Sequence, residues 1–156
     1  MEVESFKEIE NEFFERVRDQ VCCNFSTVDR AGRPYSRIMH PFWEGNVAWV
    51  LTHRNSHKSK HLASNNNVSL SYIRGNVQKP TYIDCIATWV EDIGEKTRVW
   101  NLVVNTPEPQ GFDPSSDFDS PQNEEFGLLK LTPRKITLVT FPAESYDQGN
   151  LVWRGT

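Results

Sequence analysis

The chain has 156 residues, of which 17 are basic and 21 acidic, and its formal net charge is −4 at pH 7. This length suits one domain, and 37% hydrophobic residues with 12% aromatic residues can supply its core. No apolar run approaches the roughly 20 residues that span a bilayer, and the charged start lacks a signal-peptide core. Cys22, Cys23 and Cys85 cannot all pair within one chain, so we expect a reduced, cytoplasmic protein that does not act at a membrane.

The first part of the chain predicts one helix and three strands. Apolar residues recur at helical spacing across residues 5–18, where Ser5 and Glu8 fit a capping box. Strands are predicted at residues 21–28, 35–43 and 47–52, with turns at 29–34 and 44–46. The short second turn indicates that the second and third strands pair antiparallel.

The second part of the chain continues this mixture of short elements. We expect helices at 56–64 and 94–103, strands at 68–73, 81–91, 126–131, 135–141 and 151–153, and turns at 65–67, 74–76 and 132–134. Residues 105–125 are rich in Pro, Asp, Ser and Glu, which is typical of a long surface loop or a poorly ordered segment. Many short antiparallel strands with few helices predict a single mainly β domain, a β-barrel or closed sheet with α additions.

Hydroxyl and basic side chains gather where the strand predicted at 47–52 ends and a helix begins. Ser56 is a good N-cap, and a helix start presents unpaired N–H groups and the positive end of the dipole. With Thr52, His57 and Lys58 as further donors, this stretch predicts a pocket for a small dianion such as phosphate. The alternative is an ordinary capped helix with a solvated basic face.

The charge distribution supports an anion site in the same region. Residues 30–83 contain eight basic residues and one acidic residue, Glu44, so this window carries +7 and the remainder of the chain −11. Charge that is segregated this strongly raises the local concentration of an anionic ligand.

Three other chemistries fit the residues less well. His53, His57 and His61 lie four apart, but no carboxylate or cysteine is near them and the neighbouring basic residues repel a cation, which disfavours a metal site. The chain has no Gly-x-Ser-x-Gly motif, dinucleotide fingerprint or phosphate-binding P-loop. A sequence pI of about 5.6 disfavours a nucleic-acid-binding protein. Such a protein would bind oligonucleotides in a salt-sensitive way and would carry no chromophore.

Two short motifs resemble those of a known family. Gly32-x-Pro34-x-x-Arg37 enters the second strand, and Thr52-x-x-x-Ser56-x-Lys58 follows the third. In this order they resemble the pyridoxamine-5′-phosphate-oxidase-like flavoproteins of the FMN-binding split-barrel fold, over about residues 22–100. The resemblance implies that Arg37, Ser56, His57 and Lys58 bind the phosphate of FMN. Many family members have arginine where this chain has His57.

The resemblance also implies the surroundings of the flavin ring and the oligomeric state. Ile38, Met39, Leu51 and Thr52 would line the ring, partly through backbone groups. Family members are homodimers, and Trp153 and Arg154 resemble residues that reach the partner's flavin. For Trp153, simple core packing is the alternative. The family also leaves room for deazaflavin or haem in place of FMN.

The chain departs from the true pyridoxamine-phosphate oxidases and looks more like their general-stress-protein relatives. Residues 90–96 are acidic where the oxidases carry an aromatic-x-x-x-Arg-Pro-x-x-Ser run, and a lysine expected after Arg37 is missing from His40-Pro41-Phe42. We therefore predict an FMN-dependent oxidoreductase of unassigned substrate, or a non-catalytic flavin-binding or stress-related protein. No general base stands out, although His40 is a weak candidate.

Overall fold

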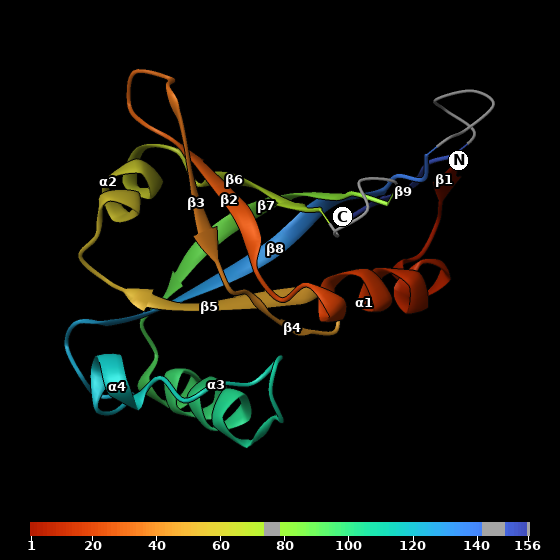
Figure 1. The fold of residues 1–156 in the computed structure, drawn as a ribbon. Coiled ribbons are helices and arrows are strands. Elements are labelled where there is room, and N and C mark those ends of the chain that lie inside the picture. The colour runs from red at the N-terminus through yellow and green to blue at the C-terminus, as the bar shows by residue number, and fades with distance from the viewer. Residues whose placement is uncertain (74–78, 142–148, 156) are drawn as a thin grey trace.

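The computed structural model of this chain describes residues 1–73, 79–141 and 149–155, and within them nine strands form one sheet (Figure 1). The strands are β1 (Glu2–Val3), β2 (Cys23–Val28), β3 (Pro34–Met39), β4 (Phe42–Glu44), β5 (Val47–His53), β6 (Asn67–Tyr72), β7 (Thr81–Val90), β8 (Phe126–Leu138) and β9 (Leu151–Arg154). The helices are a 3₁₀ turn, η1 (Phe6–Glu8), and α1 (Glu10–Asp19), α2 (His57–Ser64), α3 (Ile93–Asn105) and α4 (Ser115–Phe118). The prediction of a mainly β chain with added helices is confirmed.

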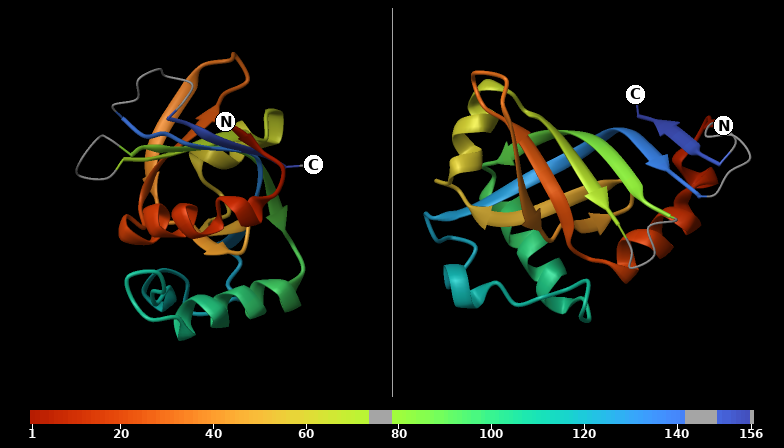
Figure 2. Two further views of the ribbon diagram at one scale, coloured as in Figure 1. Left: turned by 90° about the vertical axis from the view of Figure 1, so that its right-hand side faces the viewer. Right: turned by 45° about the horizontal axis from the view of Figure 1, so that its top comes forward.

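The sheet curls into a barrel that stays open along one seam. Its antiparallel path runs β3–β2–β6–β7–β8–β5–β4, and only two residues join Met39 at the end of β3 to Phe42 at the start of β4. The two ends of this path therefore lie close together (Figure 2). Among the described residues, no strand pairs with the outer edge of β3 or with the corresponding edge of β5 after Trp49. The barrel is split between these two edges.

The longest strand, β8, carries different partners along its two halves. Its first half pairs with β5, while residues 135–138 pair with β9, which in turn pairs with β1 in parallel. β9 and β1 consequently extend from the end of the sheet that lies away from α2 (Figure 1).

Two hydrophobic clusters hold the fold together. The larger fills the barrel interior, where Ile9, the N-cap of α1, and Phe13 and Val17 within it recur four residues apart and pack against the inward faces of the strands. The smaller lies on the outer face of β4, β5 and β8 beneath α3 and α4 and contains Phe42, Trp49, Val99, Trp100, Val103, Phe118, Phe126 and Leu128. Residues of β5 alternate between them, with Ala48 and Val50 in the first and Trp49 in the second.

Two predicted strand boundaries are wrong, and proline is involved in both. The single strand expected at 35–43 is two strands, because Pro41 has no N–H to donate and restricts the backbone of His40. Only β4 therefore forms the predicted hairpin with β5, while β3 pairs with β2. Conversely, Pro133 does not separate two strands, because the register of β8 against β7 shifts there and the extra residue is accommodated in a bulge.

The segment 105–125 is more structured than its composition suggests. It contains α4, and Phe118 is only 4% exposed, with its ring centroid 5.3 Å from that of Phe126. Its few apolar side chains cover apolar surface that β5, β8 and α3 already provide.

Near the N-terminus, the predicted capping pair is present, since the Ser5 N–H donates to Glu8 Oε1 at 2.8 Å. The predicted single helix is instead η1 followed by α1. The turn predicted at 74–76 lies outside the described residues.

Candidate functional site

The start of α2 is built by local sequence signals. The apolar strand β5 ends at His53, and Ser56 adopts an extended backbone as the N-cap of α2. The Ser56 N–H donates to Ser59 Oγ at 3.2 Å, which closes the first turn. No acidic residue occupies this turn, so the positive end of the helix is not neutralised locally.

Lys58 is a buried cation within that turn. Its side chain is 8% exposed, and Nζ donates to Ser56 Oγ at 3.1 Å. Burial lowers the pKa of Lys58 below its usual range, and the positive charge of Arg37 lowers it further. Arg37 is linked to the same helix, because Thr27 Oγ1, which accepts its hydrogen bond, lies 2.8 Å from His61 Nδ1 on α2.

Arg37 reaches the same place from β3. Its side chain points to the inward face of the strand, where Nη1 donates to Thr27 Oγ1 at 2.7 Å and more weakly to the Phe25 carbonyl at 3.4 Å. Burial lowers the pKa of Arg37. Within the described ranges, neither Arg37 nor Lys58 pairs with a carboxylate. Two half-buried or buried cations thus lie together without a counter-charge, an arrangement that an anion would stabilise.

The structure therefore brings together three of the predicted phosphate ligands, Arg37, Ser56 and Lys58. The fourth, His57, is exposed at the start of α2, and its ring lies 6.3 Å from that of His61. All four lie at the end of the seam where β5 runs out into α2.

The residues predicted to line a flavin ring occupy both edges of the seam. On β3, Ile38 is 64% exposed on the outer face, while Met39 packs against the barrel interior. On β5, the buried Thr52 follows Leu51, whose side chain packs against the outer cluster. Leu51 can therefore face the seam only through its backbone. Because no strand in the described part of the chain pairs with either edge, backbone N–H and C=O groups are available along both.

The structure does not bring Trp153 and Arg154 to this site within one chain. Trp153 is 8% exposed, and its ring centroid lies 5.5 Å from that of Phe6 in the main core. Arg154 forms an ion pair with Glu2 and is otherwise exposed. Both belong to β9, which pairs with the half of β8 away from β5.

Two buried residues, Thr27 and His61, join the site without having been predicted as ligands. Thr27 Oγ1 lies 2.8 Å from His61 Nδ1 and also accepts the hydrogen bond of Arg37. Helical spacing could have indicated His61, which is one turn beyond His57 on α2. The role of Thr27 depends on strand pairing, which places it directly opposite Tyr35.

The three histidines considered for a metal do not converge. His53 packs its ring on Phe118 at 4.8 Å, away from His61, which is bonded to Thr27. Among the residues that the structure describes, no group of three or more His, Cys, Asp or Glu side chains is arranged to hold a metal ion.

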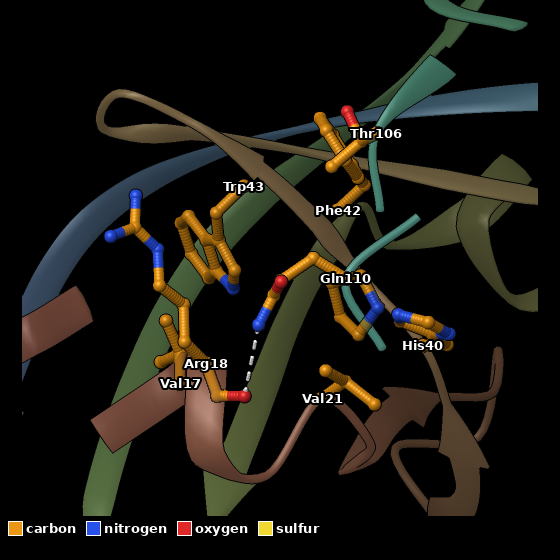
Figure 3. Close-up of a pocket in the computed structure, with 9 residues that line it drawn as sticks. Val17, Arg18, Val21, His40, Phe42, Trp43, Thr106 and Gln110 are labelled. Carbon is orange, nitrogen blue, oxygen red and sulfur yellow. Dashed lines mark hydrogen bonds between the residues drawn. The ribbon is translucent and has the colours of Figure 1, made fainter. Parts of the chain in front are cut away.

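His40 lies in a separate pocket at the other end of β3 (Figure 3). This cavity of about 280 Å³ lies between the end of α1, the β3–β4 bend and the segment after α3, where Gln110 Nε2 donates to the Arg18 carbonyl at 3.3 Å. Burial lowers the pKa of His40, although a hydrogen bond with the Gln110 backbone offsets part of the shift. Its Nε2 has no hydrogen-bond partner among the described residues, and because this atom is buried behind the pocket wall a substrate would contact it only after a rearrangement. His40 is thus poorly placed for a general base.

Comparison with known proteins gives a consistent picture. A family model described as "Pyridoxamine 5'-phosphate oxidase" matches residues 9–140. No curated protein matches the chain. Among solved structures, a protein from Clostridium acetobutylicum related to general stress protein 26 is 14% identical, with 96% of each chain covered and a TM-score of 0.73.

Two further structures share the fold. General stress protein 26 from Bacillus anthracis is 22% identical over 83% of this chain and 93% of its own, with a TM-score of 0.63. A pyridoxamine 5′-phosphate oxidase-related, FMN-binding protein from Nostoc punctiforme is 16% identical over 97% and 96%, with a TM-score of 0.66. These likenesses confirm the predicted split-barrel fold. Across the described ranges, no helix has the length and apolar character needed to cross a membrane.

Proposed function

This chain belongs to the pyridoxamine 5′-phosphate oxidase family, and from that premise we propose that it binds FMN as an oxidoreductase of unassigned substrate. One observation carries the proposal: Arg37 and Lys58 converge beside the start of α2 without a carboxylate partner among the described residues. A phosphate monoester fits this arrangement because it carries about two negative charges and three acceptor oxygens. Ser56 and the first N–H groups of α2 supply neutral donors to the same ligand.

The split in the barrel suits the rest of a flavin nucleotide. The edges of β3 and β5 carry Ile38 and Met39 on one side and Leu51 and Thr52 on the other, and both lead away from the phosphate site. We assign the ring to this seam, where free backbone groups can hydrogen-bond to its polar edge and the β3 side chains can pack on it. When bound, a flavin supplies two-electron chemistry, while the protein binds and orients the reactants.

Oxidation of a vitamin B6 phosphate is not supported by the start of α3. Asp92 caps this helix by accepting the Glu95 N–H at 2.7 Å, and the exposed Glu91 beside it already pairs with Arg54 at 3.0 Å. Carboxylates repel a substrate phosphate, so this end of α3 is unsuited to hold one.

A second candidate function is a non-catalytic flavin-binding protein. It is favoured by the position of His40, whose buried Nε2 is not accessible to a substrate. The candidates share the phosphate site and differ only in turnover.

We extend the proposal to a cytoplasmic homodimer in which Arg154, one of the two β9 residues predicted to reach the partner's flavin, makes that contact. Arg154, whose side chain is 62% exposed, is available for such a contact. The buried indole of Trp153 favours the core role instead. Three free cysteines suit a reducing compartment.

The absorption spectrum of the freshly purified protein tests the proposal. Visible flavin bands that persist through gel filtration support it, and their absence after incubation with excess FMN contradicts it. Rapid bleaching by a reduced nicotinamide favours the oxidoreductase, whereas flavin that stays oxidised with every donor tried favours the binding protein. Bands of a deazaflavin or a haem would identify a different cofactor and overturn the assignment of FMN.

A further inference from the structure

Thr27 links the two elements that supply the cations. It lies on β2, is fully buried, and its Oγ1 is 2.7 Å from Arg37 Nη1 on β3 and 2.8 Å from His61 Nδ1 on α2. One hydroxyl group therefore connects the arginine to the helix that carries Ser56 and Lys58.

The direction of each hydrogen bond follows from the donors present. A guanidinium can only donate, so Thr27 Oγ1 is the acceptor for Arg37. The single proton of the hydroxyl is then free to be donated to His61 Nδ1, which satisfies all three groups. This assignment makes His61 a neutral imidazole that carries its proton on Nε2.

The opposite assignment is worse on two counts. If His61 Nδ1 carried the proton, Thr27 Oγ1 would accept two hydrogen bonds and its own buried proton would lack a partner. A doubly protonated His61 would add a third positive charge beside Arg37 and Lys58. The rings nearest to that of His61 belong to Tyr35, at 4.9 Å, and His57, at 6.3 Å, and neither side chain is a carboxylate that could balance this charge.

We propose that Thr27 and His61 are positioning residues, which hold Arg37 in the orientation that a phosphate group requires. The inference rests on the proposed function only for the identity of the ligand. His61 is 7% exposed and fixed by packing, so it holds the Thr27 hydroxyl in a single rotamer. That rotamer presents an oxygen lone pair to Arg37 and fixes the guanidinium beside α2, the helix that carries Lys58.

Thr27→Val tests this role, because valine keeps the shape of threonine and removes the hydroxyl. We expect FMN affinity to fall about tenfold or more, since Arg37 loses the acceptor that orients it. Thr27→Ser keeps the hydroxyl and should restore affinity to within about threefold of the parent. Riboflavin, which lacks the phosphate, should bind Thr27→Val and the parent alike, whereas general structural damage would weaken both ligands.

Thr81→Val is the matched control. Thr81 is also a fully buried strand threonine, but its Oγ1 has no hydrogen-bond partner among the described residues. We expect this variant to bind FMN as the parent does. An FMN affinity of Thr27→Val equal to that of Thr81→Val would overturn the positioning role.

Nitrogen-15 NMR of the flavin-free protein separates this inference from the proposed function. The His61 signals, assigned by their loss in His61→Gln, should report a protonated Nε2 and an unprotonated Nδ1 at pH 7. The Nη groups of Arg37 should give resolved signals in the parent and averaged signals in Thr27→Val. A His61 protonated on Nδ1 refutes the positioning role of Thr27 and His61, whether or not FMN binds. An Arg37 that is equally mobile in the parent and in Thr27→Val refutes it as well. If both NMR signatures, of His61 and of Arg37, are present and the parent binds no FMN, the positioning role is supported and the proposed function fails.

Discussion

Replacement of Lys58 by methionine should separate the binding role of this residue from its effect on stability. Methionine keeps an unbranched stem in a site where the lysine is 8% exposed, and it removes the ammonium group. A hydrogen bond to a charged group is worth about 1.5–3 kcal/mol. At about 1.4 kcal/mol per tenfold, FMN affinity should fall roughly 10- to 150-fold.

The same substitution should not lower the free energy of unfolding of the flavin-free protein. The ammonium group of Lys58 is buried and repelled by Arg37, both of which oppose its charged form. The hydrogen bond that its charged Nζ donates to Ser56 is worth about 1.5–3 kcal/mol, and loss of that bond is offset by relief of the burial of the charge and of the repulsion. We therefore expect a free energy of unfolding within about 1 kcal/mol of the parent value.

The pH dependence of the free energy of unfolding shows whether the charge of Lys58 stabilises or destabilises the folded protein. The pKa of Lys58 is lower in the folded protein than its usual value of 10.5, so between the two values the unfolded chain binds more protons. This group therefore makes stability rise with pH in that window. Lys58→Met lacks this contribution. The difference in the free energy of unfolding between parent and variant, measured as a function of pH, therefore reports Lys58 separately from other titrating groups.

Fluorescence titration with FMN and urea unfolding without it provide the two measurements. Lys60→Met, which changes an exposed lysine of the same helix, is the matched control and should match the parent in both. The reasoning is refuted if Lys58→Met binds FMN within twofold of the parent. It is refuted equally if the variant loses as much stability as it loses binding energy.

Two further predictions concern the second cluster and the thiols. Phe118→Ala should lower the free energy of unfolding by about 3–5 kcal/mol in a urea titration, because Phe118 is only 4% exposed. The loss should exceed that of Phe112→Ala. A loss below about 1 kcal/mol would show that residues 105–125 do not pack against the second hydrophobic cluster. A thiol reagent at pH 8 should label the half-buried Cys22 and spare Cys23 and Cys85 until the protein unfolds. The reason is that burial raises the pKa of the Cys23 and Cys85 thiols, to about 12 for Cys23. Fast labelling of all three cysteines in the folded protein would contradict this prediction. Since the folded state holds the Cys23 proton more tightly, its contribution to stability should decline as pH rises from about 9 toward 12.

Local signals allowed the start of α2 to be predicted correctly. The N-cap Ser56 and the position of Lys58 follow from neighbouring residues, so the helix boundary does not depend on the rest of the fold. Pro41 likewise indicates a strand break through its own backbone restrictions, although we read that stretch as one strand.

Contacts between distant residues were not predictable in the same way. Thr27 and His61 are 34 residues apart, and their hydrogen bond depends on the register of β2 and on how α2 packs over it. The burial of Phe118 depends on apolar surface contributed by β5, β8 and α3, whereas the composition of residues 105–125 describes only the segment itself. Pro133 is tolerated because β7 supplies partners on both sides of it, from Leu128 to Leu138, with the extra residue taken up in a bulge.

The ratio of riboflavin to FMN dissociation constants for the parent protein tests the central claim most directly, because the two ligands differ only by the phosphate group. If Arg37 and Lys58 each contribute a charged hydrogen bond to that group, FMN should bind about 100-fold more tightly or better at fixed pH and salt. Equal affinities would show that the two cations do not hold the phosphate and would contradict the account.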